Sequence, residues 1–474
     1  MPKQTLVMKF GGTSVGSVDA LAKAVQIVND ACTEYPRVVV ITSAMSGVTN
    51  LLLDSAALAA QGKVDSLPST ESALREKHFA IADVLIKHEK LHETTKQEIN
   101  ELILLLVNLC KAIAILGEAT PRAMDAVASL GERMSVCLLG AVLESVGINA
   151  KAIESTEFIV TNAHFQNAHP DFKATTEKAR RLLNPLMDKG IVVVTTGFIG
   201  ATPEGVITTL GRGGSDYSAA IIGSVLPADD VWIWTDVDGI MTTDPRIVKE
   251  ARTLSEITYS EVAELAYYGA KVLHPKTIRP VVDAGIGLRI RNTFNPSHPG
   301  TRLIANVPSD SHARNGQVVK AVTAIRSQRL VTIEGRGMLG VPGVAARAFG
   351  AVASTRTSVP LITQASSEQS ICFAVPSESA TSVINALRAV FASEIEDEDI
   401  DRVWMTDDVS IITVVGVGMR HTPGVAGQVF TQLGNNNANV LAIAQGSSEV
   451  SISMVVAAAD TELAVKALHE LIVK

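Results

Sequence analysis

Cysteine and clustered basic residues are both scarce in this chain of 474 residues. Its four cysteines form no C-x-x-C pair and lie in apolar surroundings, which disfavours a disulfide framework or a zinc site and indicates reduced core residues. The formal net charge is −8, and the sequence contains no extended block of Lys and Arg. Because nucleic acids and anionic membranes are bound by concentrated basic surfaces, we expect neither as a partner, and we expect a cytoplasmic protein.

Long hydrophobic runs are also missing. The N-terminus offers only Leu6 to Met8 before a glycine-rich stretch, which is too short for the apolar core of a signal peptide. The most apolar later stretch, Leu102 to Leu116, is interrupted by Asn108 and Lys111 and is shorter than the ~20 residues that cross a bilayer. We therefore predict a buried helix there and no membrane span.

No Walker sequence, G-x-x-x-x-G-K-[ST], occurs in the chain, so it is not a P-loop protein. It nevertheless begins with a lysine and a glycine-rich turn, Lys9 to Gly16, directly after an apolar run. Glycine lets backbone N–H groups approach an anion closely, and a helix predicted to start near Ser17–Asp19 would direct its positive end to the same place. A phosphate-binding loop and an ordinary strand-to-helix turn are both open at this point.

The order of the elements predicts the fold class. Strand-like apolar runs alternate with helical patterns between Lys9 and about Asn295, which indicates a mostly parallel sheet covered by helices on both faces. With 47% hydrophobic and 19% charged residues, the composition is typical of a globular protein of roughly two to four domains. The polar, turn-rich segment from Pro308 to Gly316 is the best candidate for a linker.

An internal repeat with an offset of 81 residues follows this linker. Val331 to Ala345 returns as Ile412 to Ala426, and Leu361 to Glu368 returns as Ala442 to Glu449 in the same register. Each copy predicts a strand, a glycine turn, a helix, two further strands and a second helix. This order is typical of a small ferredoxin-like module.

A second glycine-rich segment, Thr208 to Ala220, leads into an apolar helix whose expected N-cap is Ser215 or Asp216. Arg212 lies among the glycines, where a guanidinium suits bidentate binding of a carboxylate or a phosphate. For Asp216 alone, a capping role and a functional role are equally open.

Taken together, these segments resemble the aspartate kinases of the amino-acid kinase superfamily. The resemblance covers nearly the whole chain, and its motifs are highly specific in combination. They are KFGGTSVG at Lys9–Gly16, SAMSGVTN at Ser43–Asn50, GERMS at Gly131–Ser135, LGRGGSDYSAA at Leu210–Ala220, WTDVDGIMTTDPR at Trp234–Arg246 and YYGAKVLHP at Tyr267–Pro275.

The resemblance implies an α/β protein with an amino-acid kinase fold, a three-layer αβα sandwich with a mostly parallel sheet, followed by two ferredoxin-like ACT domains. We expect the catalytic domain at residues 1–307, with a helical substrate-side region at about 60–130. The ACT domains are expected at 318–400 and 401–474. In some relatives the second module is nested inside the first, so these two blocks need not be separate units.

The resemblance also implies a reaction: transfer of the γ-phosphoryl group of ATP to the side-chain carboxylate of L-aspartate, giving 4-phospho-L-aspartate and ADP. This is the first step of lysine, threonine and methionine biosynthesis from aspartate. A carboxylate with a reference pKa of about 3.9 is already ionised at neutral pH and needs no general base. Lys9 would meet the transferring phosphoryl group, and Asp216 would orient cations around it. Mg²⁺ is implied by ATP, but the sequence indicates no protein ligand for it.

Further site residues are carried over from the resemblance. The substrate-binding residues would be Ser43, Thr49, Glu132 and Arg212. The nucleotide-binding residues would be Lys9, Gly11, Gly12, Ser14, Thr235, Asp236, Arg246, Lys271 and Val272. The effector-binding residues would be Gln364 and Gln445. One departure is Met241, where similar relatives often carry Tyr in the nucleotide pocket.

The ACT modules would pair across subunits in a homodimer or homotetramer and bind threonine, lysine or both. The repeats are most similar to those of bifunctional aspartokinase and homoserine dehydrogenase enzymes, but a chain that stops at Lys474 has no room for a dehydrogenase. A feedback-insensitive aspartokinase of ectoine synthesis is one alternative. A non-enzymatic amino-acid sensor is another, disfavoured because Lys9, Glu132, Arg212 and Asp216 are all present. A kinase for glutamate also remains open, because one extra methylene changes binding by only ~1 to 3 kcal/mol.

Overall fold

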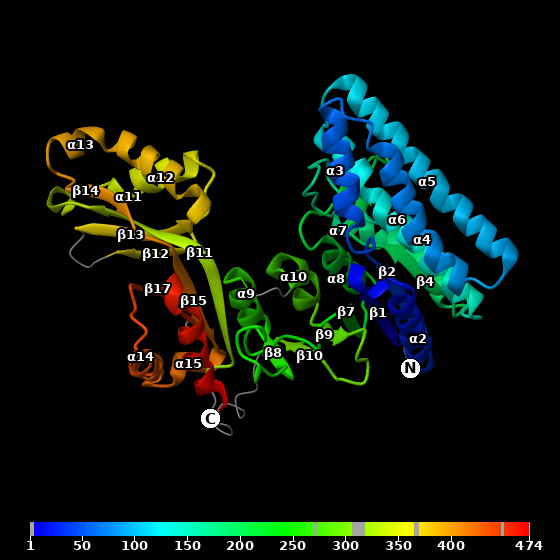
Figure 1. Ribbon diagram of the computed structural model, residues 1–474. Helices are drawn as coiled ribbons and strands as arrows, with labels where there is room; N and C mark the ends of the chain where they lie inside the picture. Colours follow the sequence, from blue (N-terminus) through cyan, green and yellow to red (C-terminus); the bar gives the residue numbers. More distant parts are fainter. Residues whose placement is uncertain (1–3, 270–272, 306–317, 365–368, 447–449, 474) are drawn as a thin grey trace. The chain divides into compact units, whose positions relative to one another are not determined.

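The computed structural model describes residues 4–269, 273–305, 318–364, 369–446 and 450–473 (Figure 1). The chain divides into two compact units. The first consists of Met1–Ile240, Ser255–Ile257 and Leu273–Ala305. The second consists of Met241–Leu254, Thr258–Val272 and Asn306–Lys474, so two segments from the middle of the chain belong with the C-terminal repeats.

The first unit is built on an eight-stranded sheet with the order β3-β4-β2-β1-β7-β9-β10-β8. Every pairing from β3 to β9 is parallel, whereas β10 pairs with β9 in the antiparallel sense. The predicted mostly parallel sheet is therefore confirmed. The strands are β1 (Thr5–Phe10), β2 (Arg37–Thr42), β3 (Ala150–Ile153), β4 (Val192–Thr196), β7 (Asp230–Thr235), β8 (Glu256–Thr258), β9 (Gly287–Asn292) and β10 (Thr301–Ile304), with a separate hairpin of β5 (Ile199–Ala201) and β6 (Ile207–Thr209).

Helices cover both faces of this sheet, which gives the three layers that the fold class requires. One face packs against α2 (Val18–Glu34) and α6 (Pro121–Ser145), and the other packs against α7 (Phe172–Met187) and α8 (Gly214–Val225). Three further helices contact α6 and form a bundle with it (Figure 1). They are α3 (Val48–Ala60), α4 (Leu67–Leu85) and α5 (Glu89–Leu116). The remaining helices of this unit are α1 (Gly12–Val15), η1 (Ser155–Glu157) and α10 (Pro275–Asp283), the last packed on α8.

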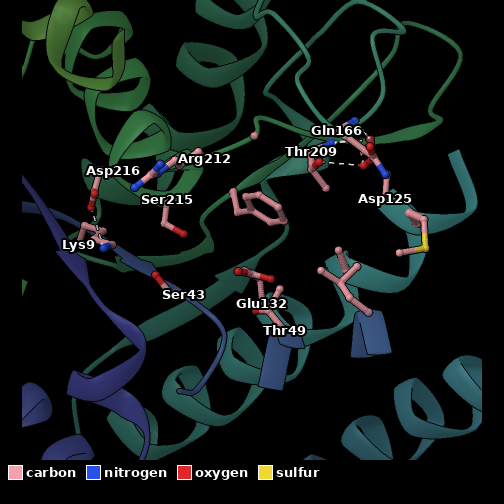
Figure 2. A pocket seen from close by; sticks show the side chains of 17 residues that line it. Lys9, Ser43, Thr49, Asp125, Glu132, Gln166, Thr209, Arg212, Ser215 and Asp216 are labelled. Carbon is pink, nitrogen blue, oxygen red and sulfur yellow. Dashed lines mark hydrogen bonds and ion pairs between the residues drawn. The ribbon is translucent and has the colours of Figure 1, made fainter. Parts of the chain in front are cut away.

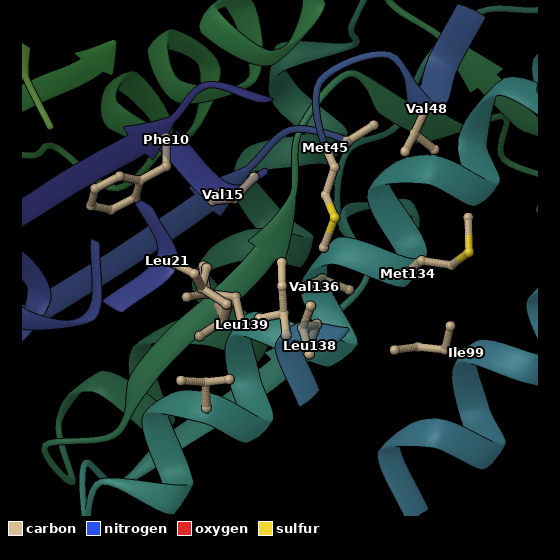
Figure 3. Packing of buried hydrophobic residues seen from close by; sticks show 14 of the residues in the cluster. Phe10, Val15, Leu21, Met45, Val48, Ile99, Met134, Val136, Leu138 and Leu139 are labelled. Atoms are coloured by element: carbon tan, nitrogen blue, oxygen red, sulfur yellow. The ribbon is translucent and has the colours of Figure 1, made fainter. Parts of the chain in front are cut away.

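A single hydrophobic cluster joins the sheet to the helical bundle (Figure 3). Successive side chains of a strand point to opposite faces of the sheet, so alternate residues share one face. In β1 the alternate residues Leu6, Met8 and Phe10 all pack in this cluster. Leu21 of α2 and Leu139 of α6 are buried against the same face. Helix α6, which carries the GERMS segment, is thus held in place by its deep burial.

Helix α5 corrects the expectation of a buried helix from Leu102 to Leu116. It spans Glu89–Leu116, and apolar residues at helical spacing, such as Ile103 and Leu106, bury only one of its faces. Ile115 is 87% exposed. By length and composition alone both α5 and α6 would suffice to cross a membrane; within the protein, 33% of the apolar window of α5 and 83% of that of α6 are buried.

The second unit contains a seven-stranded sheet with the order β12-β13-β11-β15-β17-β16, and β14 also pairs with β11. Each repeat folds as strand, helix, two strands and helix, as predicted for a ferredoxin-like module. The strands are β11 (Ala321–Glu334), β12 (Leu361–Gln364), β13 (Ser370–Pro376), β14 (Arg402–Met405), β15 (Val409–Val415), β16 (Ala442–Gln445) and β17 (Ser451–Ala457). The α-helices are α9 (Tyr259–Tyr267), α11 (Val344–Ser354), α12 (Ser377–Val390), α13 (Ala392–Glu396), α14 (Val425–Asn435) and α15 (Thr461–Val473). Short 3₁₀ turns are η2 (Arg336–Met338), η3 (Val417–His421) and η4 (Ala458–Asp460).

Strand β11 serves both repeats. Its first half, from Ala321 to Ile325, pairs with β15 of the second repeat, and its second half pairs with β13 of the first. The register shifts between Ile325 and Gln328, where Ser327 has a φ of 56°. The second module therefore draws a strand from chain that precedes the first repeat.

Candidate active site

A cavity of about 470 Å³ opens where β1, β2 and β6 end in the first unit (Figure 2). Ligands of open α/β sheets bind at the carboxyl ends of the strands, so this is the expected place for an active site. The cavity brings together all of the predicted catalytic and substrate-binding side chains. They are Lys9, Ser43, Thr49, Glu132, Arg212 and Asp216.

Lys9 and Asp216 form an ion pair at one side of the cavity (Figure 2). The lysine Nζ lies 2.7 Å from the aspartate Oδ1, and the two side chains are 11% and 20% exposed. Lys9 is the penultimate residue of β1, and Asp216 lies in the first turn of α8, where the helix dipole favours a negative charge. The pair thus presents a partly buried cation whose position is fixed from two elements.

The glycine-rich segment before α8 adopts a backbone conformation and a close packing that disfavour residues with a side chain. Gly213 has a φ of 71° and is the N-cap of α8, so the expectation of Ser215 or Asp216 as the cap was wrong. A left-handed residue at this position starts the helix earlier than the sequence suggests. A Cβ on Gly214 would lie 2.6 Å from the Phe198 ring, which shows how tightly this turn packs on the cavity wall.

Glu132 is a buried carboxylate at the centre of the cavity (Figure 2). It is 3% exposed, and its Oε1 accepts a hydrogen bond of 3.2 Å from the backbone N–H of Ala44. Its Oε2 is buried without a hydrogen-bond partner among the described residues. Burial raises its pKa to about 8, against the opposing effects of the Ala44 hydrogen bond and the charge of Lys9. Such a carboxylate is suited to a cationic ligand.

The hydrogen bond between Ala44 and Glu132 forms because α6 closely approaches the loop after β2. A Cβ on Gly131 would lie only 2.7 Å from the Ala44 Cβ, so glycine is required where the helix meets the loop. Ser43 begins the same loop, and its N–H donates to Phe10 at the end of β1. Arg212 is exposed at the glycine-rich segment. The cavity therefore combines a buried carboxyl group, a guanidinium and hydroxyl groups, which complement an amino acid carrying both an ammonium and carboxylates.

Asp125 is a cavity residue that sequence reasoning missed. It lies two helical turns before Glu132 on α6 and is 1% exposed. Its carboxylate accepts hydrogen bonds from Gln166 and Thr209, both of which also line the cavity (Figure 2). Two acidic residues seven positions apart on one apolar helix are the signal that could have revealed it.

The first glycine turn, predicted for nucleotide binding, is not among the segments that line this cavity. The N–H of Gly11 donates to Trp234 O at 3.1 Å and is used within the sheet region. Gly12 faces the loop after β2, where an added Cβ would meet Ala44 O at 2.6 Å. Ser14 is wholly buried, and its hydroxyl accepts a 2.7 Å hydrogen bond from Thr293.

None of the other predicted nucleotide residues that the structure describes is among those that line this cavity. Thr235 ends β7, its hydroxyl donates to Asp236 at 3.2 Å, and Asp236 is exposed. Arg246 belongs to the second unit and pairs with Asp244 at 2.7 Å. Lys271 and Val272 lie outside the described residues.

The predicted effector residues and Met241 lie in the second unit. Gln364 and Gln445 occupy equivalent places, at the ends of the two edge strands β12 and β16, and both are exposed. The sulfur of Met241 accepts a 3.4 Å hydrogen bond from Thr253. Among the residues that the structure describes, no group of three or more His, Cys, Asp or Glu side chains is arranged to hold a metal ion.

Comparison with known proteins places these features in a family. The profile of the amino acid kinase family matches residues 4–292, and an ACT-domain profile matches residues 331–391 and 412–471. The chain is 38% identical to bifunctional aspartokinase/homoserine dehydrogenase 2, chloroplastic, of Arabidopsis thaliana over 98% of its own length, and it spans about half, 50%, of that relative. It is 34% identical to lysine-sensitive aspartokinase 3 of Escherichia coli, and this match covers 98% of each chain.

Solved structures agree with this placement. Aspartokinase III of E. coli in complex with aspartate and ADP, described as an R-state, superposes with a TM-score of 0.79 at 33% identity. The superposition covers 99% of this chain and 100% of that one. The same enzyme in complex with lysine and aspartate, described as a T-state, gives a TM-score of 0.78 at 32% identity over 99% and 100% of the two chains.

Proposed function

The chain belongs to the amino acid kinase family and, within it, to the aspartokinases, and on that premise we propose that it phosphorylates L-aspartate with ATP. The products would be 4-phospho-L-aspartate and ADP, at the start of amino-acid biosynthesis from aspartate. One observation carries the proposal. The same cavity holds the Lys9–Asp216 ion pair and Glu132, whose buried Oε2 has no hydrogen-bond partner among the described residues.

The acceptor would be recognised through opposite charges. The carboxylate of Glu132 would bind the ammonium group of L-aspartate, because an unsatisfied buried oxygen gains most from a charged donor. Arg212 would bind a carboxylate in the bidentate manner that a planar guanidinium allows. Ser43 and Thr49, which also line the cavity, would donate their hydroxyl hydrogens to the substrate.

Phosphoryl transfer would depend on positioning and charge neutralisation. The attacking carboxylate is ionised near neutral pH, so no residue needs to remove a proton. Lys9 would stabilise the charge on the transferring phosphoryl group, while Asp216 holds the ammonium of Lys9 in place. Mg²⁺ fits this donor set, because it usually keeps water and phosphate ligands beside one or two carboxylates, and Asp216 offers one. When bound, the ion would neutralise charge on the nucleotide phosphates.

Nucleotide binding would use the residues that the sequence predicts for it, some of them at or just after the ends of β1 and β7. The residues proposed for it are Lys9, Gly11, Gly12, Ser14, Thr235, Asp236, Arg246, Lys271 and Val272. The second unit would carry regulation, with Gln364 and Gln445 contacting threonine, lysine or both, and its modules would join subunits in a homo-oligomer. The exposed, equivalent strand ends that carry these two glutamines support this assignment.

The test is ATP turnover by the full chain with L-aspartate and hydroxylamine, which traps an acyl phosphate as a coloured hydroxamate. We expect a signal that requires L-aspartate and is lost in Lys9→Ala. L-Glutamate in place of L-aspartate tests the choice of acid, and titration with threonine and lysine tests the effector. Absence of hydroxamate from the folded wild-type chain, with amino-acid binding at the second unit, would leave a sensor instead.

A further inference from the structure

We propose that Asp125 is a positioning residue for the acceptor substrate: it fixes the glycine-rich segment that carries Arg212 to the helix that carries Glu132. The inference rests on the proposed function, because it assigns the consequence of this contact to L-aspartate binding. Figure 2 shows Asp125, Gln166 and Thr209 grouped at one wall of the cavity, apart from Lys9 and Asp216.

Both oxygens of the Asp125 carboxylate are fully engaged. The N–H of Gln166 lies 3.0 Å from Oδ1 and 3.0 Å from Oδ2. Thr209 donates twice, from its N–H to Oδ2 at 2.9 Å and from its hydroxyl to Oδ1 at 2.8 Å. Every partner is a donor, so the site is built for a group that only accepts, which an ionised carboxylate is.

The contacts of Asp125 join segments that are distant in the sequence. Thr209 ends β6 and stands three residues before Arg212, so fixing Thr209 fixes the start of the glycine-rich segment. The backbone around Gln166 lies against the same segment, because a Cβ on Gly211 would be 3.0 Å from Gln166 O. The side chain of Asp125 therefore binds two neighbouring backbone segments, one at Gln166 and one at Thr209.

The same helix carries the opposite end of the substrate site. Glu132 is seven residues beyond Asp125 on α6, about 10 Å along the axis and on the same face. Since α6 is deeply buried, the attachment of Asp125 sets the distance between Glu132 and the glycine-rich segment. A substrate whose ammonium binds Glu132 and whose carboxylate binds Arg212 depends directly on that distance.

An amide cannot replace this carboxylate. In Asp125→Asn one oxygen becomes an NH₂ group, which would face N–H donors of Gln166 or Thr209. Burial raises the pKa of Asp125, and the hydrogen bonds from Gln166 and Thr209 oppose that shift, so the carboxylate depends on these partners. We therefore expect Asp125→Asn to release the glycine-rich segment while leaving the volume of the side chain unchanged.

The experiment compares steady-state kinetics and amide exchange of full-length variants. For Asp125→Asn we expect the KM for L-aspartate to rise about tenfold to a hundredfold, with the KM for ATP within about twofold of wild type. The amides of residues 206–214 should exchange faster by mass spectrometry. Thr209→Ser, which keeps the hydroxyl, should retain the wild-type KM for L-aspartate.

Thr175→Val is the matched control. Thr175 is wholly buried, and its hydroxyl accepts a 3.0 Å hydrogen bond from Val160 N–H in the same unit, but it does not line the cavity. We expect it to lower stability without a selective change in the KM for L-aspartate. If Asp125→Asn behaves like this control, losing stability while both KM values stay unchanged or rise together, the proposal is overturned.

Two further outcomes remain decisive. If Asp125→Asn does not fold, Thr209→Val replaces it: loss of the hydroxyl donor should raise the KM for L-aspartate by about threefold or more, and an unchanged KM overturns the proposal. If the wild-type chain makes no aspartyl hydroxamate, the proposed function fails by itself. Amide exchange at residues 206–214 then still tests whether Asp125 fixes the glycine-rich segment. Equal exchange rates in Asp125→Asn and Thr175→Val would overturn that claim.

Discussion

The Nζ of Lys9 lies 2.7 Å from the Oδ1 of Asp216 at the cavity. Lys9 belongs to β1, and Asp216 belongs to α8, more than 200 residues later in the chain. The aspartate holds the ammonium group of Lys9 in place at the end of β1, where a phosphoryl group would be transferred. A cation fixed before the reaction stabilises developing charge without reorganisation, which is the usual origin of large catalytic effects.

Replacing Lys9 by alanine should therefore lower kcat by about a hundredfold to a thousandfold, equivalent to ~3 to 4 kcal/mol of transition-state stabilisation. The hydroxamate assay measures this loss. Lys23→Ala is the matched control, because Lys23 is exposed on α2 and its ammonium lies 5.2 Å from the centre of the Phe294 ring, outside the cavity. Equal losses in the two variants would remove Lys9 from the proposed mechanism.

The buried carboxylate of Glu132 predicts how stability varies with pH. Its pKa rises from the ordinary 4.5 to about 8 on folding, so between these values the unfolded chain has lost a proton that the folded chain keeps. This contribution to the free energy of unfolding is fully present below about pH 4.5 and is lost as the pH rises towards 8. Urea titrations from pH 5 to 8 measure the free energy of unfolding of both proteins. That of Glu132→Gln should increase relative to that of the wild type as the pH rises. A constant difference would mean that Glu132 does not titrate there.

The same group predicts proton release when substrate binds. An ammonium next to Glu132 favours its ionised form, so binding of L-aspartate below pH 8 should displace the proton that burial retains. Calorimetry at pH 7 in two buffers of different ionisation enthalpy measures the number of protons released. We expect release by the wild type and none by Glu132→Gln, whose affinity should also fall by about 2 kcal/mol or more, roughly thirtyfold. Buffer-independent binding heats for the wild type would contradict this.

Parts of the site could be predicted because the signals are local. The glycine and charge patterns around Lys9 and Arg212, and the strand ends that carry them, follow from short segments and from parallel-sheet geometry. The bonds of Asp125 to Thr209 could not be predicted, because they join residues 84 positions apart. The burial of Ser14 against Thr293 likewise depends on a contact across 279 positions.

Two features of the fold that the sequence did not specify have a similar physical cause. The repeat indicated two similar modules and left open whether they are nested, because similarity does not specify strand pairing, and β11 contributes to both. In α5 the polar Asn108 and Lys111 lie on the exposed face of one continuous amphipathic helix, so they do not interrupt it. Composition showed an apolar segment, whereas the exposure of each face depends on which neighbours pack against it.

Gly131 is predicted to be irreplaceable for packing next to the site. In Gly131→Ala the new methyl group would lie 2.7 Å from the Ala44 Cβ, and the resulting strain should cost about 1 to 3 kcal/mol of stability. Displacement of the loop should also weaken the Glu132 contact and raise the KM for L-aspartate. Gly140→Ala on the same helix is the control. Its Cβ would lie 3.2 Å from the Ala152 Cβ, and neither residue lines the cavity, so a smaller loss and an unchanged KM are expected. Thermal unfolding and kinetics of both variants decide the matter.

Glu261 predicts the stability of the second unit. Its side chain is 0% exposed, lies 3.1 Å from Lys320 Nζ and accepts a 2.8 Å hydrogen bond from Val417 N–H in the turn after β15. Glu261→Ala would leave Lys320 and two backbone N–H groups, those of Val417 and Thr258, without this partner, so we expect a loss of about 3 kcal/mol. Denaturation can be followed in this unit alone, since Trp404 is the one tryptophan that remains when Trp232 and Trp234 are replaced by Phe.

The matched control for Glu261 is a surface ion pair in the same unit. Glu394 pairs with Arg347 on the exposed side of α13, where solvent screens the interaction, so Glu394→Ala should leave the Trp404 transition nearly unchanged. Because α9 carries Glu261 and lies in the middle of the sequence, a selective loss in Glu261→Ala would also show that this helix is part of the second unit's cooperative fold. Equal denaturation midpoints for the two variants would mean that the buried pair adds nothing beyond a surface pair.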